Sequence, residues 1–224
     1  MALKFGNTKE LGGSIKAMCY APAGYGKTKL CATAPSPLII SAENGLLSIK
    51  DEGIPYIEVT SLADFREAFL FVSESADAKS FQTICIDSIT DIAETALTEL
   101  KKEVKDGRQA YGQLGEEMLA EMRKWRHLDT KHVYMTCKQD RQVDTTIGAV
   151  QFVPTMPGNM LPKQLPYWGD ELFALRIIPD KDGVQQRFIQ TQPDMAYFAK
   201  DRSGRLNTFE PPNLTDIFNK IIGQ

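Results

Sequence analysis

The sequence predicts an α/β fold with a mostly parallel central sheet flanked by helices, and three observations support this prediction. Short apolar runs such as residues 38–42 and 83–87 are continuous rather than alternating, which is typical of strands buried on both faces. Segments with helical patterning separate these runs, and strands that alternate with helices form parallel sheets. The first apolar run also leads into a glycine-rich turn and then a helix-compatible segment.

The composition is that of an ordinary globular chain. Its 224 residues are 42% hydrophobic and 25% charged, and no linker-like stretch interrupts them, so we expect one domain over residues 1–224. The net charge of -3 argues against a protein held on double-stranded DNA by bulk positive charge, but it leaves room for a local basic groove. Since no apolar run suits a signal peptide or a membrane span, we expect a cytoplasmic protein with no membrane partner.

The four cysteines indicate a reduced protein without a zinc site. Cys19, Cys31, Cys85 and Cys137 lie too far apart for a CxxC pair. Three of them, Cys19, Cys85 and Cys137, fall in strand-like apolar runs, where a thiol is usually a small buried hydrophobe.

The first elements are a strand, a short helix and a second strand. Residues 14–20 form an apolar strand that ends at the glycine-rich turn. The helix expected at 29–33 stops before Pro35 and Pro37 because proline cannot continue it. The continuous apolar run 38–42 is the next buried strand.

The next elements repeat this alternation. A strand is expected at 57–60 and another at 83–87. Between them a helix is expected over 61–75, because Ser61 and Asp64 hold capping-box positions and apolar residues recur on one face.

Two helices and a fourth buried strand follow. One helical stretch runs over about 90–105 and breaks near Asp106, and a second, amphipathic helix is expected at about 116–128. Residues 132–137 form the strand after it.

The last part of the chain is predicted to begin with a long loop. Residues 138–170 contain four prolines and three glycines, with one hairpin expected at 142–153. Closing strands are expected at 171–178, 186–190 and 195–199, and a short terminal helix after Pro211.

The glycine-rich turn is a near match to the phosphate-binding loop GxxxxGK[ST], with alanine in place of the first glycine. Its backbone N–H groups turn around phosphate oxygens, its lysine reaches the β- and γ-phosphates, and its threonine ligates Mg²⁺. The expected nucleotide-binding residues are Ala21, Pro22, Ala23, Gly24, Tyr25, Gly26, Lys27, Thr28 and Lys29. A fortuitous turn is the alternative, but the position between a strand and a helix favours the loop.

Asp87 ends the apolar strand 83–87, where an acidic residue is the usual partner of such a loop. There it would hold Mg²⁺ through water beside Thr28. A plain turn residue is the alternative for Asp87. The neighbouring Ser88 and Asp91 are expected to cap the next helix.

Glu43 directly follows the strand 38–42. Since parallel strands present their carboxyl ends at one edge of the sheet, Glu43 can face the γ-phosphate and act as the base that activates water. The alternative is a solvent-exposed turn before Asn44.

Three further residues lie at the end of the fourth strand or just after it. Thr136, Lys138 and Gln139 are placed to sense the γ-phosphate and pass its state to the long loop. Alternatively, Thr136 has only a structural role, in the hydrogen bonding of the sheet.

The long loop combines positive charge with aromatic residues, a pattern suited to single-stranded nucleic acid, whose bases stack on rings. The candidate DNA-binding cations are Lys138, Arg141 and Lys163, and the aromatics are Phe152, Tyr167 and Trp168. The alternative is that the aromatics belong to the core.

The order of these motifs, APAGYGKT, SAENGLL, ICIDSITDI, YMTCKQD and FAKDRSGRLN, resembles the RecA/UvsX-type P-loop ATPase core. It is most similar to the short phage-encoded proteins of the Sak class, which act in single-strand annealing and recombination. The resemblance implies Mg²⁺-dependent ATP hydrolysis, single-stranded DNA binding, homo-oligomers or filaments, and cooperation with a single-strand-binding protein in the host cytoplasm. By position, Glu43 matches the water-activating glutamate, and Lys200 and Arg202 match basic residues that reach a neighbouring subunit's nucleotide.

Two other functions fit the phosphate loop. One is a small-molecule kinase of the nucleoside type, although we find no short arginine-rich lid that would close over a second substrate. The other is a nucleotide-gated switch or loader that acts on a protein partner with little hydrolysis.

Overall fold

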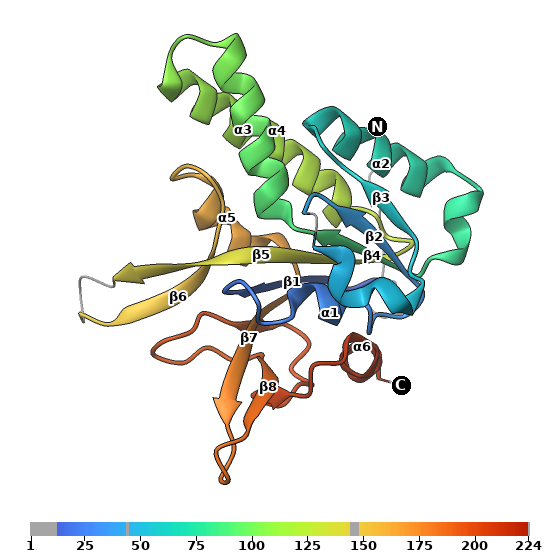
Figure 1. The fold of residues 1–224 in the computed structure, drawn as a ribbon, viewed down its shortest axis with the longest axis vertical. Helices are drawn as coiled ribbons and strands as arrows, with labels where there is room; N and C mark the ends of the chain where they lie inside the picture. Colours follow the sequence, from blue (N-terminus) through green and yellow to red (C-terminus); the bar gives the residue numbers. More distant parts are fainter. Residues whose placement is uncertain (1–12, 44, 144–147, 224) are drawn as a thin grey trace, which may run out of the picture.

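The computed structural model describes residues 13–43, 45–143 and 148–223. Its centre is a ten-stranded sheet with the order β10-β8-β7-β1-β5-β4-β2-β3, to which β6 is added on β5 and β9 on β7 (Figure 1). The strands are β1 (Lys16–Ala21), β2 (Pro37–Ser41), β3 (Tyr56–Glu58), β4 (Thr83–Asp87), β5 (His132–Val143), β6 (Val150–Thr155), β7 (Glu171–Pro179), β8 (Gln185–Gln190), β9 (Lys200–Asp201) and β10 (Phe209–Glu210).

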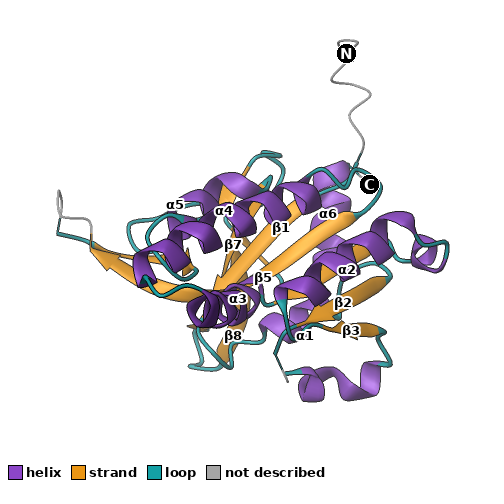
Figure 2. Ribbon diagram, turned by 90° about the horizontal axis from the view of Figure 1, so that it is seen from above, coloured by secondary structure: helices purple, strands orange, loops and turns teal. Residues whose placement is uncertain are grey.

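Helices cover both faces of the sheet (Figure 2). They are α1 (Lys27–Cys31), α2 (Leu62–Glu74), α3 (Ile89–Glu103), α4 (Gly107–Arg126), α5 (Leu161–Trp168) and α6 (Leu214–Ile222), with 3-10 turns η2 (Leu46–Glu52) and η3 (Asp77–Ser80). No helix in the described ranges is both long and apolar enough to cross a bilayer.

The sheet is mostly parallel, as the alternation of strands and helices predicts. Strands β7, β1, β5, β4, β2 and β3 run parallel. Strands β8, β6 and β9 pair with members of this group antiparallel, and β10 pairs antiparallel with β8. In β1, Met18 and Tyr20 face the apolar layer under α2 to α5, and Ala17 and Cys19 face the layer under α1 and α6. Both faces of the strand are therefore buried, which explains its continuous apolar run.

The expected loop at 138–170 contains regular structure. β5 continues to Val143 and pairs with β6, on either side of the expected hairpin turn, and α5 follows. The prolines of this stretch predict a loop. Pro162 is nevertheless compatible with a helix, because it lies in the first turn of α5, where its missing N–H costs no hydrogen bond.

Two other predicted elements differ in the structure. The helix expected at 116–128 begins at Gly107, because the Asp106 side chain accepts a hydrogen bond from the Arg108 N–H and caps it. The strand expected at 195–199 is wrong: Tyr197 makes only an isolated bridge to Phe152, and the pairing with β7 comes from β9.

All four cysteines are buried and none forms a disulfide, so the prediction of buried thiols is confirmed. Burial raises the pKa of Cys19 to about 11 and that of Cys137 to about 12, so both thiols stay protonated at neutral pH.

Candidate nucleotide-binding site

Strand β1 lies at the centre of the sheet, between β5 and β7. The phosphate loop follows β1 and leads directly into α1. Gly24 has φ 77° and Gly26 has φ 103°, the left-handed region that favours glycine. These glycines let the chain turn back on itself before α1, so the sequence pattern folds as a compact loop at a helix start.

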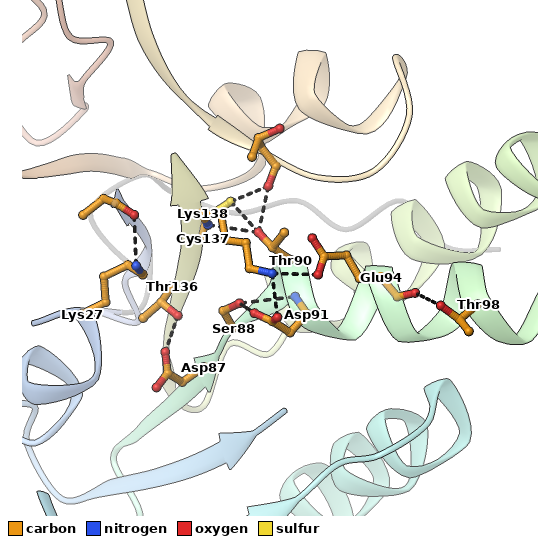
Figure 3. Close-up of polar contacts among 12 residues, drawn as sticks. Lys27, Asp87, Ser88, Thr90, Asp91, Glu94, Thr98, Thr136, Cys137 and Lys138 are labelled. Atoms are coloured by element: carbon orange, nitrogen blue, oxygen red, sulfur yellow. Dashed lines mark hydrogen bonds and ion pairs between the residues drawn. The ribbon is translucent and has the colours of Figure 1, made fainter. Parts of the chain in front are cut away.

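Lys27 points back over the loop from the first turn of α1. Its Nζ donates to the carbonyl oxygens of Ala21, at 3.0 Å, and Pro22, at 3.1 Å. Figure 3 shows the Lys27 side chain in this conformation. Both partners are neutral carbonyls, which the oxygens of an anion in the loop can replace.

Asp87 is held between two hydroxyl groups at the end of β4. The Thr28 hydroxyl donates to its Oδ2 at 2.7 Å. The Thr136 hydroxyl donates to its Oδ1, as Figure 3 shows. Thr136 is fully buried, so its influence on a γ-phosphate would pass through Asp87.

The pair formed by Thr28 and Asp87 fits Mg²⁺ in its chemistry. A hydroxyl and a carboxylate beside a phosphate loop are the oxygen ligands that this ion takes together with water and phosphate. Within the described part of the chain, no group of three or more His, Cys, Asp or Glu could hold a metal. The ion would therefore be held by this pair, by water and by the nucleotide.

Glu43 lies beside this pair, at the carboxyl end of β2. A Cβ added at Gly45 would lie 3.6 Å from Glu43 Oε2 and 3.8 Å from Thr28 Oγ1, so both side chains border the same position. Glu43 also lines a cavity of about 640 Å³ whose walls include Ser41, Leu46, Ile49, Tyr56 and Thr95. Solvent and ligands therefore have access to its carboxyl group.

The Glu43 carboxyl group is influenced by Asp91 of α3. Hydrogen bonding with Asp91, burial and the nearby negative charges of Asp91 and Asp87 raise the pKa of Glu43 to about 7. Burial also acts to raise the pKa of Asp91, but hydrogen bonds with Glu43 and Lys138 outweigh it and hold that pKa below its usual value. Glu43 is therefore the member of the pair that exchanges a proton near neutral pH, as a general base needs.

Lys138 anchors this pair from the end of the buried part of β5. Its Nζ lies 2.8 Å from Asp91 Oδ1 and 2.7 Å from Glu94 Oε2 (Figure 3). Lys138 is also level with Ala21, where the phosphate loop begins. The next residue, Gln139, is half-buried at the base of the β5–β6 hairpin.

A protein-family model described as an AAA domain matches residues 14–203, which include the phosphate loop, Glu43, Asp87 and Asp91. The chain belongs to this AAA-domain family. Membership indicates a nucleotide-binding ATPase, in agreement with the geometry of the loop. A comparison with curated proteins gave no match.

The candidate DNA-binding residues of this AAA domain lie in different environments. Arg141 on β5 and Lys163 on α5 are exposed, whereas the charge of Lys138 is already paired. Trp168 is buried and its indole N–H donates to the Met122 carbonyl oxygen at 2.7 Å, so it belongs to the core and cannot stack on a base. Tyr167 is 71% exposed.

Lys200 and Arg202 of the AAA domain lie near the amino-terminal ends of β7 and β1, whereas the phosphate loop follows the carboxyl end of β1. Asp201 between them pairs with Glu171, which is level with Ala17 near the start of β1. Lys200 Nζ donates to two backbone carbonyls of residues 166 and 169, and Arg202 lies 3.2 Å from Asp170. Any role at a nucleotide would therefore be at that of a neighbouring subunit, and it stays a prediction.

Two groups at the site have contacts that the sequence does not predict. Asp91 caps α3 as expected, since its N–H bonds to Ser88, but its carboxylate also pairs with Lys138 and raises the pKa of Glu43. Arg187 of β8 belongs to no sequence motif, yet its Nε donates to the Tyr25 carbonyl oxygen at 2.9 Å. No local pattern marks either contact, because both depend on which strands lie side by side.

Proposed function

We propose that this AAA domain is a Mg²⁺-dependent, RecA-like ATPase that acts on single-stranded DNA in phage-type recombination or annealing. The observation that carries the ATPase part is the cluster of Lys27, Thr28 and Asp87 with Glu43 beside them. The DNA part is supported by the hairpin that starts at this cluster and by the resemblance of the motifs to RecA/UvsX-type proteins.

The residues of the site have different roles in hydrolysis. Lys27 exchanges its two loop carbonyls for phosphate oxygens and offsets their charge. Thr28 and Asp87 would hold Mg²⁺, which offsets charge on the phosphates when it is bound. Glu43 takes the proton of the attacking water, and the neighbouring Asp91 carboxylate favours the protonated Glu43 that results.

The same cluster can connect the nucleotide to DNA. Asp91 contacts both Glu43 and Lys138, and Lys138 begins the exposed part of β5, which carries Arg141. A change in the charge of Glu43 therefore acts on Asp91 and Lys138 at the base of the β5–β6 hairpin. A single-strand-binding protein is the protein partner we expect on the same DNA.

The experiment that tests this function measures ATP turnover with and without single-stranded DNA, beside candidate nucleoside acceptors. We expect turnover that requires Mg²⁺ and rises several-fold with DNA. Phosphorylation of a nucleoside would instead identify a small-molecule kinase. Negligible turnover with tight nucleotide binding would identify a switch or loader acting on a protein partner.

The exposed cations of the hairpin region provide a variant test. Arg141→Ala combined with Lys163→Ala is expected to lower DNA-stimulated turnover while basal turnover is kept, because both side chains are exposed and neither belongs to the phosphate loop. Lys102→Ala, which removes an exposed cation from α3, is the matched control. Equal DNA stimulation in all three proteins would refute the DNA-binding assignment.

We further propose that the site is completed between subunits of a homo-oligomer or filament by Lys200 and Arg202. A cation supplied in trans stabilises the transferring phosphoryl group. Arg202→Ala is then expected to be inactive alone and to regain turnover when mixed with inactive Lys27→Ala, because some interfaces combine two intact parts. Full activity of dilute monomeric Arg202→Ala would show that one chain holds the complete site.

A further inference from the structure

Arg187 of β8 lies against the phosphate loop although it is 162 residues away from it in sequence. Its Nε donates to the Tyr25 carbonyl oxygen at 2.9 Å. A Cβ added at Gly26 would lie 3.4 Å from the same Nε and 3.7 Å from Arg187 Cδ. The side chain therefore runs along the peptide that joins Tyr25 to Gly26, immediately before Lys27.

The charge of Arg187 has no counter-ion among the described residues. Other arginines of this domain do pair: Arg66 with Glu117 and Glu121, Arg176 with Asp194, and Arg202 with Asp170. In the described ranges the hydrogen bonds of the Arg187 guanidinium are limited to the one from Nε, so its two terminal nitrogens are available. An exposed cation is thus fixed at an anion-binding loop by one neutral contact.

The position of Arg187 indicates which part of a nucleotide it would meet. In a phosphate loop the backbone N–H groups cradle the α- and β-phosphates, and the lysine reaches the β- and γ-phosphates. Arg187 lies beside the backbone just before that lysine, which is the part of the loop nearest the diphosphate. Guanidinium groups bind phosphate oxygens through two parallel hydrogen bonds.

We propose that Arg187 is a nucleotide-binding residue of the same subunit, whose guanidinium contacts the α- and β-phosphates. This inference rests on the proposed function, because it assigns a role in binding the nucleotide that Lys27 and Thr28 hold. Arg187 would strengthen the binding of ADP and ATP alike, whereas Lys27 favours the triphosphate. It is thus a determinant of affinity for the diphosphate group rather than of the hydrolytic step.

The test compares the affinities of the wild-type chain, Arg187→Gln and Arg187→Lys for ADP and ATP over a range of salt concentrations. Glutamine can still donate to the Tyr25 carbonyl but carries no charge, so it separates charge from anchoring of the loop. We expect Arg187→Gln to weaken both nucleotides about tenfold or more, the scale of one charge-assisted hydrogen bond, and to reduce the salt dependence of binding. Arg187→Lys should recover part of the loss.

Lys181→Ala is the matched control, because it removes a cation from the exposed turn of the same β7–β8 hairpin. It should bind both nucleotides as the wild type does, and thermal unfolding without nucleotide should show all variants folded. Wild-type ADP affinity in Arg187→Gln would overturn the inference and leave the proposed function intact. A loss of affinity with unchanged salt dependence would overturn it too, because Arg187 would then only shape the loop. A wild-type chain that binds neither nucleotide would refute the proposed function as well.

Discussion

Lys27→Ala is expected to abolish ATP turnover and strongly weaken triphosphate binding while the fold stays intact. Lys27 makes its hydrogen bonds with the carbonyls of Ala21 and Pro22 and with no buried carboxylate, so alanine leaves no unpaired charge behind. The ammonium is needed where negative charge concentrates on the phosphates, and the loss of such an electrostatic group lowers turnover by about 10²-fold or more.

The measurement is steady-state ATP hydrolysis beside nucleotide titrations, with thermal unfolding as the check of the fold. Lys105→Ala removes an exposed lysine from the turn between α3 and α4 and should hydrolyse ATP at the wild-type rate. A folded Lys27→Ala protein with an unchanged rate would refute the phosphate-loop assignment.

The parts of the site that the sequence predicts are those carried by local patterns. The phosphate loop is contiguous, and its glycines at 24 and 26 have the left-handed backbone that the motif requires. Asp87 was predictable because it ends a continuous apolar strand, and the edge of a parallel sheet brings strand ends together. The structure adds that Thr28 and Asp87 are in direct contact.

The contacts that the sequence does not predict depend on strand order. Arg187 reaches Tyr25 because β7 lies beside β1 and β8 beside β7, an arrangement that no spacing reveals. Asp91 joins Glu43 to Lys138 because β2 and β5 both neighbour β4, which leads into α3.

The sequence also does not predict the environment of the Trp168 side chain. In the sequence it stands among prolines and cations, in a stretch expected to be a loop. In the structure it ends α5, which packs on α4, and its N–H meets the Met122 carbonyl oxygen in the core. Composition alone could not separate a stacking residue from a core residue here.

Glu43→Gln is expected to keep ATP binding but to slow hydrolysis by about 10²-fold or more, the usual contribution of a positioned base. The amide preserves size and hydrogen bonding to Asp91 but cannot accept a proton from water. Glu52→Gln, at the exposed end of η2, is the matched control and should leave the rate unchanged. Hydrolysis at the normal rate in folded Glu43→Gln would make Glu43 a turn residue only.

The pH dependence of the rate tests the same assignment through Asp91. Hydrogen bonding to Asp91, burial and neighbouring negative charge raise the pKa of Glu43 to about 7, so below that pH the carboxyl holds a proton and cannot act as a base. The wild-type rate should therefore increase as the pH rises through about 7. Asp91→Asn removes a negative charge and gives Glu43 an amide donor, and both changes favour the ionised carboxylate. In Asp91→Asn the rate should then increase at a lower pH than in the wild type, whereas in Glu43→Gln the rate should show no such increase with pH. If the rate increased at the same pH in wild type and Asp91→Asn, the proton acceptor would be a different group.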